Sequence, residues 1–227
     1  MEDIYLNFDD TLNPTIQSPN CQYPLYFRQS EATLMDIEYY KKFIENCISR
    51  FRHSRTYKNY KAYLYDIGFN RCQFLSNIDS ESADLEMHHV ITIYDITLLI
   101  TEWFIKTQGS VTSFEVVMKL KEEHKENNIP IVMLSESVHQ MVHANPEFII
   151  PPQMVFGYWI DLLQKYKEGI TVELANKVII FLKRGIELEQ NNSLYKQKLL
   201  DVRQNVLDFS TYNSCCLTTR KYNEIMY

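Results

Sequence analysis

Apolar residues recur at helical spacing along most of the chain. Between Asp36 and Phe51 they stand three or four positions apart, which predicts an amphipathic helix. A second helix is expected from Tyr57 to Asp66, with Gly68 ending it. After Pro152 the same spacing continues in three further stretches, which we interpret as three C-terminal helices.

Two polar tetrapeptides predict where further helices begin. Thr92-Ile-Tyr-Asp95 and Thr112-Ser-Phe-Glu115 each place an acid three positions after a threonine, as in a capping box. The first is expected to open a helix that ends at Gly109, and the second a helix that runs to about Glu126.

Short runs of a different period predict strands over residues 71–75, 84–90 and 130–134, the first two forming a hairpin with a long turn. Ser135 then caps a helix over 136–144. The predicted fold class is mainly α with a small β-hairpin, an α+β arrangement. Residues 1 to about 34 are expected to be irregular, with at most one short strand.

The Pro-rich segment from Asn145 to Pro152 is the candidate boundary between parts of the chain. We therefore divide the chain into residues 1–68, a core over 69–145 with a helical insertion at 92–126, and a helical region over 153–212.

The composition excludes several classes of protein. The chain has 227 residues, 45% of them hydrophobic, which is ordinary for a globular protein. No apolar run reaches the roughly 18 residues that a membrane span needs, and the acidic N-terminus is unlike a signal peptide. Five scattered cysteines without a CxxC pair indicate a reducing compartment. These features predict a cytoplasmic protein without a membrane partner.

The net charge of −6 argues against a surface that binds nucleic acid everywhere. One local stretch differs, because its basic residues interleave with aromatic ones and no acid interrupts them. It predicts contacts to a nucleic-acid backbone, and the alternative is a solvated helix face with its tyrosines in the core, the more common meaning of a run of charges. Its basic residues are Arg50, Arg52, Arg55, Lys58 and Lys61.

Four of the six histidines fall in two tight groups. His139 and His143 are four apart on a predicted helix, so they share a face and can approach one metal ion. His88 and His89 end a predicted strand, where a turn of the backbone is expected to bring both imidazoles to one cavity. A zinc-peptidase motif is excluded, since Gln140 stands where the motif needs a glutamate base.

The stretches Leu85–Val90 and Ile131–His143 resemble the two halves of the HNH, or His-Me finger, endonuclease motif, in a variety without the zinc-binding cysteines. The resemblance implies a ββα-metal core. It also implies that His89 is the general base, that Asn128 or its neighbour Asn127 orients this base, and that His88, His139 and His143 bind one divalent cation. Pro130 occupies the position of the family's usual asparagine.

The cation expected in use is Mg²⁺ or Mn²⁺, while imidazole ligands favour Zn²⁺ or Ni²⁺ in vitro. Glu86, Asp84 and Glu136 are candidates to accept hydrogen bonds from the ligating histidines.

The predicted function is accordingly a metal-dependent endonuclease that hydrolyses DNA, encoded by a bacteriophage and acting in the host cytoplasm. One alternative is a catalytically degenerate protein of the same scaffold that binds DNA or protein. Another is a helical interaction module whose histidines only pack. Association of copies through the C-terminal helices is a further expectation.

Overall fold

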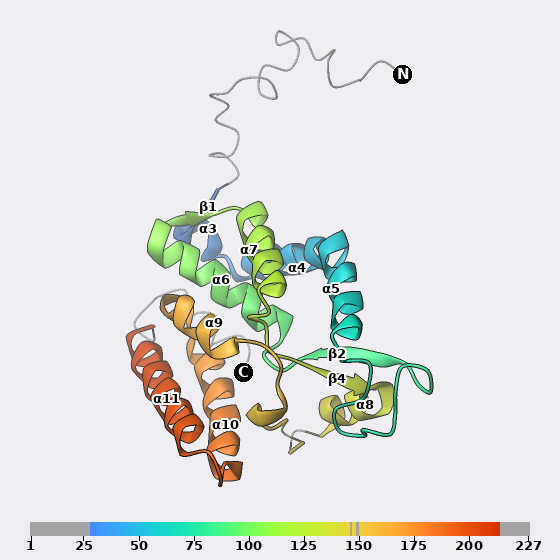
Figure 1. Ribbon diagram of the computed structural model, residues 1–227. Helices are drawn as coiled ribbons and strands as arrows, with labels where there is room; N and C mark the ends of the chain where they lie inside the picture. Colours follow the sequence, from blue (N-terminus) through green and yellow to red (C-terminus); the bar gives the residue numbers. More distant parts are fainter. Residues whose placement is uncertain (1–27, 146, 149, 214–227) are drawn as a thin grey trace, which may run out of the picture.

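The computed structural model describes residues 28–145, 147–148 and 150–213. It confirms the predicted mainly-α, α+β fold class, with two antiparallel two-stranded sheets among the helices (Figure 1). In the N-terminal part the elements are β1 (Gln29–Ser30), α3 (Glu31–Leu34), α4 (Ile37–Arg52), α5 (Arg55–Asp66) and β2 (Leu85–His89). The middle part contains α6 (Ile93–Gln108), β3 (Ser110–Val111), α7 (Ser113–Lys125), β4 (Ile131–Ser135) and α8 (Glu136–Ala144). The C-terminal elements are η2 (Pro152–Met154), α9 (Trp159–Lys165), η3 (Lys167–Gly169), α10 (Val172–Leu188) and α11 (Ser193–Asn213).

Helix α6 lies at the centre of the molecule. It is apolar around most of its circumference and buries eleven of its sixteen residues, as expected of a helix with neighbours on all sides. Its N-cap threonine accepts from the Asp95 amide, and Gly109 ends it in the left-handed conformation at φ 73°. The η3 turn crosses α6 so closely that a Cβ on Gly169 would overlap the Leu99 carbonyl oxygen.

Helix α7 begins as its sequence predicts. The Thr112 side chain accepts from the Glu115 amide, and the Glu115 carboxylate accepts from the Thr112 amide, so the capping box is complete.

The strand prediction is correct for β2 and β4 but wrong for residues 71–75. These residues form no strand, and Arg71 makes an isolated bridge with Asp79. The side chain of Asp79 accepts from the amides of Glu81 and Ser82 and so fixes a tight local turn instead of a hairpin arm. The antiparallel partner of β2 is β4, with Met87 opposite Met133.

The outer edge of β4 is also bonded. Ile131 exchanges two backbone hydrogen bonds with Phe156, 3.1 and 2.9 Å long. Gln73 donates its amide to the Met133 carbonyl and accepts from the Met133 amide through its side chain, at 2.9 and 2.8 Å.

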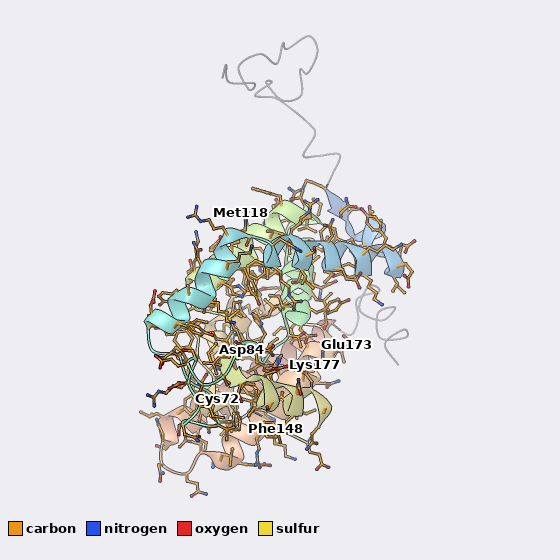
Figure 2. The ribbon with its side chains drawn as sticks, turned by 90° about the vertical axis from the view of Figure 1, so that its right-hand side faces the viewer. Cys72, Asp84, Met118, Phe148, Glu173 and Lys177 are labelled. Atoms are coloured by element: carbon orange, nitrogen blue, oxygen red, sulfur yellow. The ribbon has the colours of Figure 1, made fainter. Side chains whose placement is uncertain are left out.

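The predicted division into three parts is not reflected in separate cores. Buried residues from Leu34 to Val206 form one continuous cluster. Figure 2 shows Cys72, Asp84 and Phe148 around the β2–β4 sheet and α8, and Met118 of α7 toward the other end of the view. Within the described residues, every helix is too short or too polar to span a bilayer.

Candidate metal centre

The antiparallel pair β2–β4 and the helix α8 that follows it bring three histidines together. His88 comes from β2, and His139 and His143 come from α8. The His88 ring centroid lies 5.1 Å from that of His139 and 5.2 Å from that of His143. We call these three residues the histidine triad.

The triad has the spacing of a ligand set. One ring nitrogen from each residue lies within 4.8 Å of the others, and the Nε2 atoms of His139 and His143 are 3.1 Å apart. Two nitrogens bound to one tetrahedral zinc ion at about 2.05 Å stand about 3.3 Å apart, close to the observed separation.

Glu86 supports the triad from the same face of β2, two residues before His88. Its carboxylate contacts Nδ1 of His139, which leaves Nε2 of that ring toward His143. A carboxylate on the far nitrogen is the usual partner of a metal-ligating histidine. Of the other two acceptor candidates, Glu136 accepts from the Gln140 side chain instead, and the Asp84 backbone carbonyl accepts from the Glu136 amide.

The triad lies at the protein surface with one buried member. His88 is 9% exposed, while the His139 side chain is 24% exposed and His143 is exposed. Burial, followed by the neighbouring charges of His139 and His143, lowers the pKa of His88 to about 4. The imidazole is therefore neutral at pH 7, the form that binds a metal.

A groove of about 310 Å³ lies beside His88. Its walls are largely apolar, with Val142 from α8 and Phe181 from α10 among them, and Lys177 adds a charged end. Lys177 is already paired with the buried Asp95 carboxylate at 2.8 Å.

His89 is on the opposite face of β2, and the expectation that both adjacent imidazoles reach one cavity is wrong. Consecutive side chains of a strand point to opposite faces, and the strand continues through His89 without the expected turn. The Nε2 atom of His89 lies 3.3 Å from Nε2 of His124, on α7. Burial and the His124 ring together lower the pKa of His89 well below 6.5.

His124 is fully buried among aromatic rings and was not singled out from the sequence. Its ring centroid lies 4.5 Å from that of Phe51 and 5.3 Å from that of Tyr60. A signal was present, because His124 continues the buried stripe of Val116, Val117 and Leu120 on its helix.

Asn128 does not contact a histidine. Its side-chain amide donates to the Glu123 carboxylate at 2.6 Å and to Glu126 at 3.1 Å. Glu123 is fully buried and also accepts from Lys165 and the Tyr166 hydroxyl, each at 2.6 Å. Asn128 therefore completes a buried polar network.

The basic stretch is divided between two helices. On α4, Arg50 donates to the side chains of Asn46 and Ser113. On α5, the Lys61 ammonium group lies 5.8 Å from the Tyr65 ring centroid. Burial raises the pKa of Tyr57, and the neighbouring charge of Arg52 offsets part of this rise. Lys58 is exposed on α5, and Arg55 lines a separate groove.

A family described as Bacteriophage G278-like virion protein has a model that matches residues 3–213. No curated protein and no solved structure matches the chain.

The match contradicts the predicted DNA endonuclease, because it assigns the chain to a family of particle components. The predicted bacteriophage context is confirmed, and the family description points to the phage particle rather than to the predicted cytoplasmic location. The resemblance to the HNH motif, a DNA partner and association of copies through the C-terminal helices stay predictions.

Proposed function

The chain belongs to the Bacteriophage G278-like virion protein family, and from this membership we propose that it has a structural role in the phage particle. The observation that carries the proposal is the extent of the match, which spans residues 3–213 and so includes all the described elements. The single continuous core agrees with a structural part that is built as one unit.

Mass spectrometry of gradient-purified phage particles tests this role. Peptides of this chain are expected to remain in the particle band in constant ratio to the other particle proteins. A phage-encoded enzyme of DNA metabolism provides the control and is expected to be lost on purification. Recovery of the chain from infected-cell lysate but not from the particles would contradict the proposal.

We propose further that the histidine triad binds one Zn²⁺ ion in this structural part. Three imidazole nitrogens suit zinc, whereas Mg²⁺ prefers oxygen ligands, which the triad does not supply. The carboxylate of Glu86 on Nδ1 of His139 supports the same assignment, since it holds that ring in one tautomer.

An ion at this position would link two short elements. Strand β2 has five residues and α8 nine, and α8 buries only Val138. Few apolar contacts therefore hold α8 in place, and a shared ion would fasten it to β2. The expected role of the metal is thus to stabilise the surface formed by β2, β4 and α8.

Zinc binding is tested by thermal unfolding of chelator-treated protein. Zn²⁺ at about 100 times its dissociation constant adds about 2.7 kcal/mol, which raises the Tm by about 5–10 °C. Mg²⁺ is expected to leave the Tm unchanged.

Matched variants locate the effect. His139→Ala is expected to remove the zinc-dependent shift. His53→Ala, which changes an exposed histidine at the end of α4, is expected to keep it. An equal zinc shift in both variants would show that the ion binds elsewhere and would overturn the assignment.

A further inference from the structure

A groove of about 390 Å³ lies between α5 and the C-terminal end of α7, away from the histidine triad. Five of its lining residues come from α5, and the sixth comes from α7, about sixty positions further along the chain. The lining residues are Arg55, Thr56, Asn59, Tyr60, Tyr63 and Lys125.

Two tyrosines form an aromatic wall of this groove. Their rings are stacked, with centroids 6.0 Å apart and planes inclined by 28°. Tyr60 is almost buried, at 5% exposure, whereas Tyr63 is 40% exposed and presents its ring.

The side chain of Asn127 fixes both rings. The Tyr60 hydroxyl donates to its carbonyl oxygen at 3.1 Å, and its amide donates to the Tyr63 hydroxyl at 3.3 Å. The aromatic surface is therefore held in place before any ligand arrives, which reduces the entropic cost of binding.

Two cations line the groove without an acid among the lining residues. Arg55 and Lys125 take part in none of the ion pairs or side-chain hydrogen bonds of the described residues, unlike Arg50 and Lys165. The charge of this groove is positive although the chain as a whole carries −6. An anionic ligand would thus meet two uncompensated charges.

We propose that this groove binds single-stranded nucleic acid, with one base stacked on Tyr63 and the adjoining phosphate held by Arg55 and Lys125. A flat exposed ring beside paired cations is the combination that such ligands need. A duplex does not fit this chemistry, because its bases are already stacked inside the helix. The site is separate from the histidine triad and does not depend on a metal.

Fluorescence anisotropy with labelled twelve-nucleotide oligothymidylate and oligouridylate, in the presence of EDTA, tests the proposal on the full chain. Binding that weakens with salt is expected for the unchanged protein. The double variant Arg55→Ala/Lys125→Ala is expected to bind about tenfold more weakly, with a salt slope smaller by about 0.7, since the contact to one phosphate is lost.

A charge-matched control separates a site from a general charge effect. Lys41→Ala/Lys42→Ala removes two exposed positive charges from α4, outside the groove, and is expected to change affinity less than twofold. Equal weakening by the two double variants would overturn the proposal, as would absence of binding by the unchanged protein.

The stacking contact is tested at Tyr63. Tyr63→Leu is expected to lower the affinity about tenfold, while Tyr63→Phe, which keeps the ring, is expected to stay within about twofold. Unchanged binding by Tyr63→Leu would contradict the stacking. Binding of either oligonucleotide supports the site, and the ratio of the two affinities reports whether the sugar is distinguished.

Discussion

Two neighbouring histidines on one strand lie in opposite environments. His88 faces α8 and joins two partly or fully exposed imidazoles with a carboxylate beside them. His89 faces α5 and α7 and contacts His124 inside an aromatic cluster. The comparison teaches that strand alternation places two adjacent histidines in different surroundings, one beside two further imidazoles and a carboxylate and the other among aromatic rings.

The hydrogen bonds define the tautomers of the buried pair. Nδ1 of His124 lies 2.7 Å from the Leu120 carbonyl oxygen and must donate to it, so its Nε2 accepts. Nε2 of His89 then donates to His124. Both rings are neutral and share one hydrogen bond between their Nε2 atoms, whereas in the triad one ring nitrogen of each of three histidines lies within 4.8 Å of the others.

The largest expected effect is on the buried side of the comparison. His124→Ala leaves a cavity among Phe51, Tyr57 and Tyr60 and removes the bond from the ring to the Leu120 carbonyl. We expect the free energy of unfolding to fall by about 3 kcal/mol. Urea unfolding measures it, with His53→Ala as a control expected to change less than about 0.5 kcal/mol. A loss below about 1 kcal/mol would mean that the cluster is not close-packed.

Acidification is expected to act on the same pair. Burial lowers the pKa of His124 from 6.5 to about 4, against the smaller upward effect of its bond to Leu120. Between pH 6.5 and pH 4 this histidine therefore binds a proton in the unfolded chain but not in the folded chain. The free energy of unfolding is unaffected by this group above pH 6.5. It falls as the pH decreases toward 4, by about 2 kcal/mol at pH 5.

Urea unfolding at pH 7 and pH 5 checks this dependence. His124→Phe fills the same space without a titratable group, so its stability is expected to change less between the two pH values. An equal loss in both proteins would assign the acid sensitivity to other groups.

On the exposed side, the Glu86 carboxylate is expected to raise the zinc affinity of the histidine triad about tenfold. Glu86→Gln removes the charge that holds Nδ1 of His139 but leaves the three ligands in place. Competition with a fluorescent zinc chelator measures the affinity. Glu136→Gln, which changes a carboxylate that accepts from the Gln140 side chain, serves as the matched control. Equal affinities for the two variants would contradict the role of Glu86.

The smallest expected effect is that of His143→Ala in metal-free protein. This side chain is exposed, so the free energy of unfolding should change by less than about 0.5 kcal/mol, in contrast to His124→Ala. Unfolding measured with and without chelator gives the stability of the metal-free and the metal-bound protein. A loss comparable to that of His124→Ala would remove the contrast between the two clusters.

Local rules predicted the helices well. Thr112 with Glu115, Thr92 with Asp95, and Gly109 each act within a few residues, and the structure places them as the sequence indicates. The helix over 136–144 has the predicted bounds. These features depend on contacts within one turn of the backbone, which the order of residues specifies directly.

Long-range pairing was harder to predict. The partner of β2 lies more than forty residues away in β4, while the nearer run at 71–75 had a similar pattern. Likewise, the groove cation Lys125 and the buried His124 come from α7, which no local pattern connects with Arg55 or His89. Tertiary packing decides such meetings, so composition and periodicity alone could not find them.

The bonded outer edge of β4 has a consequence for assembly. An open strand edge is a template on which a neighbouring chain can add a strand of its own. Ile131 and Met133 have both amide and carbonyl groups already occupied by Phe156 and Gln73. A neighbouring chain therefore cannot add a strand at these two residues, and any contact there must be made by side chains.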